Sequence, residues 1–106
     1  MAIPESTRVQ VTLVHAEACH FCDDAGAVLA EYAREFPLDI RLVALESPEG
    51  AEAVAAHRPA MSPLILIDGQ YFSSGRLPRK KLRALLDVRA ARESRVAAGE
   101  VVGHGR

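Results

Sequence analysis

The feature that most constrains the fold of this chain is a cysteine pair placed where a strand pattern gives way to a helix pattern. The segment Val9–Val14 reads V-Q-V-T-L-V, a β-branched and partly alternating run that is typical of a strand. Cys19 and Cys22, the only cysteines in the chain, follow it closely. Beyond them the apolar residues recur with the spacing of one helix face, at Ala25, Val28, Leu29, Tyr32 and Phe36. The pair therefore stands at the start of a helix, which we expect to reach Phe36 and to end there because Pro37 follows.

Strand and helix patterns continue to alternate downstream. Residues 38–44 predict a second strand, in which Leu38, Ile40, Leu42 and Ala44 alternate with Asp39, Arg41 and Val43. Ser47 followed by Pro48 is typical of a helix N-terminus, with the serine as N-cap and the proline as the first helical residue. We expect this helix to run to His57.

The second half of the chain predicts a hairpin and a closing helix. The apolar run 64–67 is typical of a buried strand, and the Asp68-Gly69 pair after it favours a tight turn into a return strand at residues 70–73. Pro78 then opens a last helix. The residues of that helix expected in the core are Leu82, Leu85 and Leu86.

Together these patterns predict an α/β fold with the element order β-α-β-α-β-β-α. The first strand, helix and second strand form a βαβ unit, which implies two parallel strands joined by a right-handed crossover. The hairpin adds an antiparallel pair, so we expect a four-stranded mixed sheet flanked by helices on both faces. A chain of 106 residues has room for one domain, which we place at residues 9–98, with tails at 1–8 and 99–106.

The charges exclude some classes of partner. The formal net charge is −1, which gives no general attraction to nucleic acid or to an anionic membrane. Between Arg76 and Arg95, however, eight basic residues stand against only Asp87 and Glu93. That stretch is either a solvated helix face or a surface for an acidic partner. The segment 1–8 shows no secretory signal and no run is long enough to span a membrane, so we expect a cytoplasmic protein.

The cysteine pair predicts thiol chemistry. In a reducing compartment, a lone pair at this spacing is more often catalytic or metal-binding than structural. At the first turn of a helix, Cys19 would face unpaired backbone N–H groups and the positive end of the helix dipole, which favour the reactive thiolate. A charged His20 would act in the same direction. Cys22 lies one turn further along, close enough to attack a mixed disulfide on Cys19. We therefore expect Cys19 to be the nucleophile and Cys22 the resolving thiol.

A metal site is the alternative for the same two cysteines. Zinc needs two further ligands, and the candidates are His15, His20, His57 and His104. There is no second C-x-x-C and no H-x-x-x-H, and His20 lies between the cysteines, where it would have difficulty turning onto the same ion. The strand before the pair and the helix after it favour the redox interpretation.

The order of the motifs resembles the thioredoxin-fold family over about residues 9–98. A strand, a C-x-x-C that opens a helix, a second strand and helix, and then Ser62-Pro63 before an apolar strand all match its plan. In that family the proline facing the cysteines follows a cis peptide bond, and Pro63 matches its place. The resemblance implies that Ser62 offers backbone hydrogen bonds to a bound peptide or glutathione. The expected substrate-binding residues are His20, Phe21, Ser62 and Pro63, beside the catalytic Cys19 and Cys22, with no metal ligand.

Within this family the chain is similar in different parts to glutaredoxins and to thioredoxins. The short segment ahead of the first strand resembles glutaredoxins, whereas residues 74–82 are similar to the closing glycine and helix of thioredoxins. Ser73 and Ser74 stand where glutaredoxins usually have Gly-Gly, and no Asp follows before Asp87, which predicts weak glutathione binding. Leu13 stands where thioredoxins place a buried acid.

The resemblance implies a thiol–disulfide oxidoreductase that reduces protein disulfides without a bound cofactor. Its partners would be disulfide-containing proteins and an electron donor, either a reductase or glutathione or another low-molecular-weight thiol. We expect a monomer with no nucleic-acid and no membrane partner. The alternative from the same family is a glutaredoxin-like protein that holds a metal or an iron–sulfur cluster, with one cysteine from each subunit of a dimer.

Overall fold

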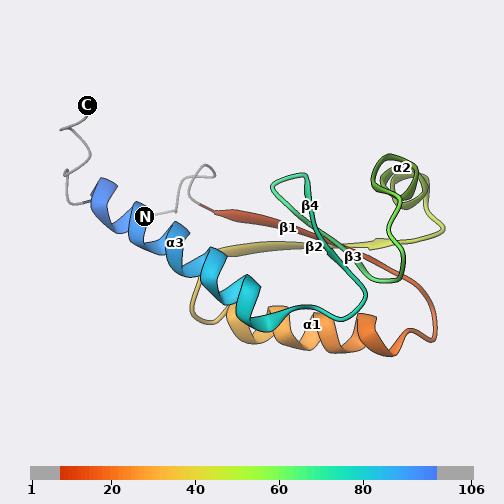
Figure 1. Cartoon of the computed structure of the whole chain (residues 1–106), viewed down its shortest axis with the longest axis horizontal. Coiled ribbons are helices and arrows are strands. Elements are labelled where there is room, and N and C mark those ends of the chain that lie inside the picture. Colours follow the sequence, from red (N-terminus) through yellow and green to blue (C-terminus); the bar gives the residue numbers. More distant parts are fainter. Residues whose placement is uncertain (1–7, 98–106) are drawn as a thin grey trace.

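The computed structural model describes residues 8–97 and confirms the predicted order of elements (Figure 1). The elements are β1 (Val9–His15), α1 (His20–Tyr32), β2 (Leu38–Ala44), α2 (Pro48–His57), β3 (Leu64–Ile67), β4 (Gln70–Ser74) and α3 (Arg79–Ala97). The strands form one four-stranded sheet in the order β2-β1-β3-β4. β1 is parallel to β2 and antiparallel to β3, and β4 is antiparallel to β3. The expected α/β fold with a mixed sheet is therefore correct.

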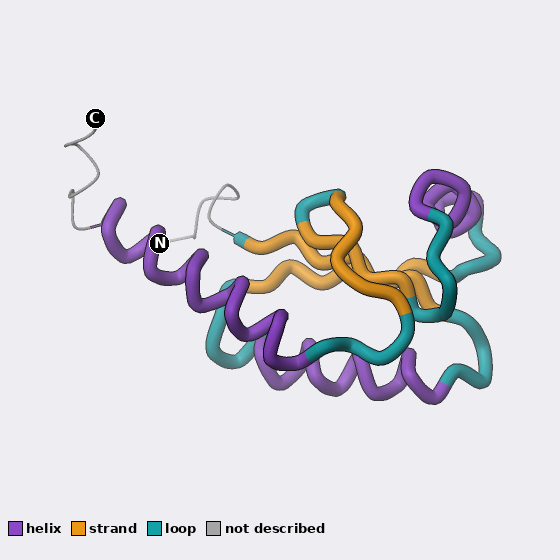
Figure 2. Tube along the Cα trace, viewed as in Figure 1, coloured by secondary structure: helices purple, strands orange, loops and turns teal. Residues whose placement is uncertain are grey.

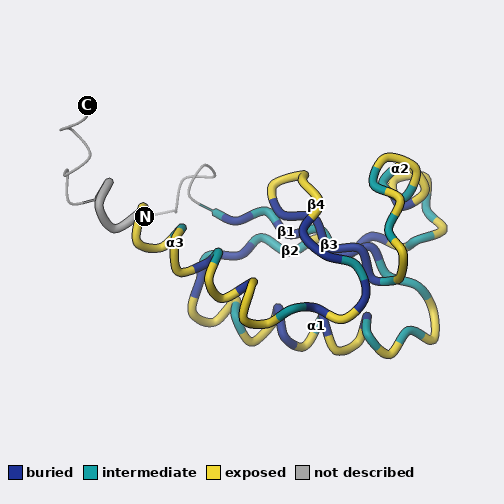
Figure 3. Tube along the Cα trace, in the orientation of Figure 1, coloured by how far each residue is buried: buried dark blue, intermediate teal, exposed yellow. Residues whose placement is uncertain are grey.

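Two layers of helix enclose the sheet (Figure 2). α1 and α3 lie on one face and α2 on the other. The main core fills the first interface, where fully buried Leu29 of α1 and Leu82 of α3 meet the sheet around Ile65. A smaller cluster of Val14, Val43, Leu64 and Leu66 lies under α2, which contributes Ala53. Figure 3 shows the corresponding pattern, with buried residues toward the sheet and exposed residues along the outer sides of the helices.

Local sequence signals set the turns and caps as predicted. Asp68 and Gly69 both have positive φ, 52° and 82°, as a two-residue hairpin turn of the primed type requires. Ser47 is the N-cap of α2, and its Oγ accepts a hydrogen bond from the Gly50 N–H at 3.0 Å. Pro48 is the first residue of that helix.

The expected end of the first helix is wrong. α1 ends at Tyr32, and Phe36 lies beyond it in a turn, although Phe36 is buried as the helix pattern required. The proline at position 37 disfavours helical geometry in the residue before it, which accounts for the exclusion of Phe36 from the helix. Leu42 is 66% exposed, although it shares the alternation of β2 with the buried Leu38.

Three loops leave the same end of the sheet, on the right in Figure 1. Leu64, at the start of β3, pairs with Val14 near the end of β1 and with Ser74 at the end of β4. The β1–α1, α2–β3 and β4–α3 loops therefore begin or end side by side. The first of these loops leads into the cysteines, the second contains Ser62 and Pro63, and the third contains Arg76.

No helix among the described residues is long and apolar enough to cross a membrane. The expected tails, 1–8 and 99–106, lie outside the described residues except for Arg8, and the domain boundaries stay predictions.

Candidate active site

Cys19 is the N-cap residue of α1. Its backbone is extended, with φ −111° and ψ 105°, as is usual at an N-cap. Its Sγ accepts a hydrogen bond from the Cys22 N–H at 3.1 Å. The N–H groups of Cys22 and Asp23 also donate to the Cys19 carbonyl oxygen, each at 3.1 Å. The sulfur takes the position of the oxygen in a serine or aspartate cap, so a negative charge on it would be stabilised by this N–H group and by the helix terminus.

The two cysteines form a disulfide and differ in exposure. Their Cα atoms are 5.1 Å apart. Cys22 is only 7% exposed, whereas Cys19 is partly exposed at the end of the sheet. A protein substrate can therefore approach Cys19 more readily than Cys22. This difference is the one that the predicted roles of nucleophile and resolving thiol require.

The core behind the cysteines is apolar. Leu13, at the position where the resemblance implied a missing acid, is 2% exposed and belongs to the main core. Among the residues whose burial the structure describes, the buried polar residue is Ser73, and no carboxylate is buried. When Cys22 is reduced, the core therefore offers it no buried acid as a proton acceptor.

The loop before β3 has the geometry expected from the resemblance. The Ser62–Pro63 peptide bond is cis, as predicted, and Pro63 is fully buried. The Pro63 carbonyl oxygen accepts a hydrogen bond from the Gly75 N–H at 3.0 Å. Met61 lies over Gly75, with its Sδ 3.3 Å from the position that a Cβ on Gly75 would take. The second and third loops are thus held together, and Met61 is 53% exposed beside them.

The two residues between the cysteines differ in their surroundings. His20 is exposed, whereas Phe21 is partly buried. The guanidinium carbon of Arg76 lies 5.9 Å from the centre of the Phe21 ring, within the range of a cation–π contact. Sequence reasoning did not single out Arg76, because its place beside the cysteines follows from the fold.

A metal site at the two cysteines would need further ligands, and the described part of the chain does not provide them. No group of three histidine, cysteine or acidic side chains gathers there in a geometry that could hold an ion. Of the four candidate histidines, His104 lies outside the described residues.

These elements and the paired cysteines define a thioredoxin fold. The solution structure of a thioredoxin from Thermus thermophilus is similar to this chain, with a TM-score of 0.52 and 21% sequence identity. The match covers 95% of this chain and 86% of the thioredoxin. Neither a protein-family model nor a curated protein sequence matches the chain. The likeness establishes the fold.

Proposed function

We propose that this protein is a thiol–disulfide oxidoreductase that reduces disulfides in cytoplasmic proteins. The observation that carries the proposal is the position of the two sulfurs. Cys19 is partly exposed and accepts a hydrogen bond at the N-terminus of α1, and Cys22 is bonded to it from a buried position. A disulfide with a purely structural role would not need a partly exposed sulfur at the N-terminus of a helix.

The reaction starts from the reduced protein. The Cys19 thiolate attacks one sulfur of the substrate disulfide, which forms a mixed disulfide and releases the other substrate sulfur as a thiolate. Cys22 then attacks the Cys19 sulfur, which releases the second substrate sulfur. The proton of Cys22 passes to solvent or to a departing substrate thiolate, because no buried carboxylate lies among the described residues. The substrate gains two electrons, and its two thiolates take up two protons, one released by Cys22 and one from solvent, while the protein is left as the disulfide seen here.

The loops around Cys19 are suited to hold an extended substrate segment. The hydrogen bond from the Gly75 N–H to the Pro63 carbonyl oxygen holds the loop before β3 against the β4–α3 loop. Ser62, partly exposed, would offer its backbone to the substrate, while Phe21 and the exposed His20 would contact the substrate beside the reacting sulfur. These four residues, His20, Phe21, Ser62 and Pro63, make up the proposed binding site.

An external donor must return two electrons to the disulfide after each turnover. A reductase or a low-molecular-weight thiol would serve, and the Ser73–Ser74 pair argues against a dedicated glutathione site. The protein would act as a monomer without a bound cofactor.

The proposal is tested with a protein disulfide substrate and a chemical dithiol as the electron source. The wild-type protein should accelerate reduction, and Cys19→Ser should abolish the acceleration. A matched control is Ser74→Ala, which removes a small hydroxyl at the end of β4 and leaves both cysteines in place. A wild-type protein without activity, or one purified with stoichiometric zinc or iron bound to the cysteines, would contradict the proposal in favour of metal binding.

A further inference from the structure

Most basic side chains of α3 are already engaged within the fold. Its ion pairs to other elements are Arg79–Glu31 at 3.0 Å, Arg83–Glu35 at 2.9 Å and Arg89–Asp68 at 2.6 Å. These pairs tie α3 to α1, to the turn after α1 and to the β3–β4 turn, and they neutralise much of the charge of the helix. This part of the basic stretch is therefore explained by packing within the molecule.

Arg76 and Lys80 differ from those residues. Both are exposed, and neither has an acidic partner within 4.0 Å among the described side chains. Lys81, by contrast, turns toward β4, where its Nζ donates to the Phe72 carbonyl oxygen at 3.3 Å and lies 4.9 Å from the centre of the Phe72 ring. Two cations at the start of α3 are thus available to a partner.

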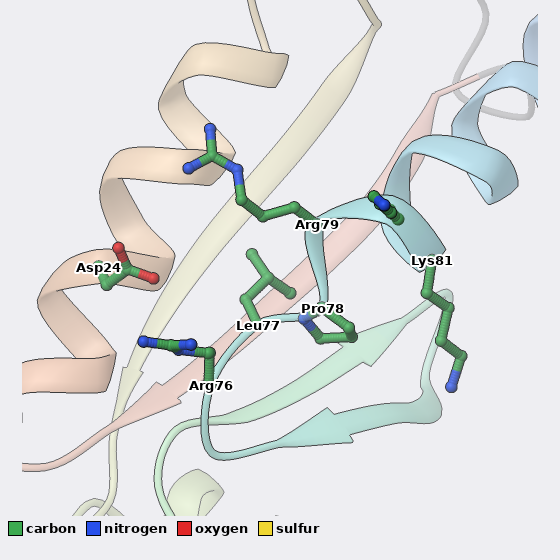
Figure 4. A pocket seen from close by; sticks show the side chains of 7 residues that line it. Asp24, Arg76, Leu77, Pro78, Arg79 and Lys81 are labelled. Atoms are coloured by element: carbon green, nitrogen blue, oxygen red, sulfur yellow. The ribbon is translucent and has the colours of Figure 1, made fainter.

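These cations border a cavity of about 490 Å³ between α1 and the start of α3 (Figure 4). Its charged lining consists of Arg76, Arg79, Lys80 and Lys81 on one side and a single carboxylate, Asp24 of α1, on the other. Figure 4 shows Arg76 and Arg79 reaching toward α1 while Lys81 points away from it. We call this cavity the Arg76 pocket.

The Arg76 pocket adjoins the proposed reaction centre. Arg76 contacts the ring of Phe21, which lies between the two cysteines in the chain. A group bound at Arg76 is therefore next to a substrate held at Cys19. Glu17 and Asp23 are exposed on the cysteine segment itself and would repel an acidic group there. These charges therefore favour an acidic group of a substrate on the side of the disulfide that faces α3, and disfavour one on the side of Glu17 and Asp23.

We propose that the Arg76 pocket selects protein disulfides that carry an acidic side chain close to the cystine. A carboxylate of the substrate would bind Arg76 and Lys80 while Cys19 attacks the disulfide. The proposal rests on the proposed function and names its substrate class. Complementary charge of this kind accelerates encounter and fixes orientation more than it increases affinity, so it acts on kcat/KM.

The test compares two cystine peptides of equal length, one with glutamates and one with lysines beside the cystine. At low ionic strength the wild-type protein should reduce the acidic peptide about fivefold faster in kcat/KM, the size expected for two exposed charge contacts. The preference should shrink at physiological salt, because the screening length falls from about 30 Å at 0.01 M to about 8 Å at 0.15 M.

Charge reversal separates recognition from a general effect on the cysteines. The double variant Arg76→Glu, Lys80→Glu should prefer the basic peptide, because the charge at the Arg76 pocket is reversed. A general change in the reactivity of the cysteines would instead affect both peptides equally. The matched control is Arg34→Glu, Arg92→Glu, which makes the same change in net charge. Arg34 follows the far end of α1, and Arg92 lies about 20 Å along α3 from its first residue, so the control should keep the wild-type preference.

The outcomes distinguish the two proposals. Equal rates for the two peptides, or a control that loses the preference as fully as the Arg76 and Lys80 variant, would overturn the inference and leave the oxidoreductase intact. Failure to reduce either peptide, together with failure on a protein disulfide, would overturn the proposed function itself and the inference with it.

Discussion

The charges in the first turn of α1 predict opposite effects of two substitutions on the redox potential. His20, between the two cysteines, and Asp23, directly after Cys22, are both exposed there. In the proposed mechanism the reduced protein carries a thiolate on Cys19, and the oxidised protein does not. A nearby positive charge therefore stabilises the reduced form and makes the potential less negative, and a negative charge does the reverse. His20→Ala should make the potential more negative, and Asp23→Asn less negative.

The expected magnitudes follow from the geometry at Cys19. The helix terminus, whose N–H lies 3.1 Å from the sulfur, contributes most, about 0.3 to 1 kcal/mol and up to about 2 when partly buried. An exposed charge about 6 to 8 Å away contributes roughly 0.5 to 0.7 kcal/mol in water. Since about 30 mV corresponds to roughly 1.4 kcal/mol for this couple, each substitution should shift the potential by about 10 to 15 mV. The wild-type potential should lie near the glutaredoxin range of about −200 to −230 mV.

The assay is equilibration of each protein in a series of thiol–disulfide buffers, followed by alkylation and separation of the two redox forms. It is best run at low salt, where the charges are least screened. Glu52→Gln, on α2 at the opposite face of the sheet, is the control and should leave the potential unchanged. An unchanged or less negative potential for His20→Ala would refute the role of the imidazole and leave the helix terminus as the activating group. Shifts of the same sign for both variants would refute the electrostatic argument as a whole.

Three further predictions concern binding and stability. The oxidised protein should bind glutathione weakly in calorimetry, because Ser73–Ser74 replaces the usual glycine pair; tight binding would refute this. Gly50→Ala should lower stability by about 1 to 3 kcal/mol in urea unfolding, because the new Cβ would overlap the carbonyl oxygens of residues 44–45; an unchanged midpoint would refute the overlap. Arg41 donates two hydrogen bonds to Glu49 and holds the pKa of that carboxyl below its usual range, so the ion pair stabilises the fold at neutral pH and the benefit is lost as the pH falls and the carboxyl is protonated. The stability difference between wild type and Glu49→Gln should therefore vanish in acid, and a difference that persists there would contradict the assignment.

The fold was predictable because its main signals are local. The Asp68-Gly69 turn, the Ser47 cap and the strand before Cys19 each follow from a few neighbouring residues, and the structure confirms all three. The cis peptide bond at Pro63 was expected from resemblance, since no local physical signal distinguishes it from a proline that merely begins a strand.

The parts that escaped prediction depend on contacts between distant segments. Leu42 belongs to the same alternating set as the buried Leu38, yet it is exposed, because alternation fixes the face of a strand and not how far a helix covers that face. The Arg76 pocket could not be foreseen either. Which cations of the basic stretch remain available depends on acidic partners on α1 and in the β3–β4 turn, such as Glu31 and Asp68.

The most direct test of the central claim is to trap the intermediate on the nucleophilic cysteine. The Cys22→Ser variant should form a stable mixed disulfide with a protein substrate, because Cys19 can still attack but nothing resolves the product. Mass spectrometry of the trapped species should locate the bond at Cys19, and the matched Cys19→Ser variant should trap nothing. A mixed disulfide that forms on Cys22 in Cys19→Ser, with none in Cys22→Ser, would reverse the assigned roles and contradict the account.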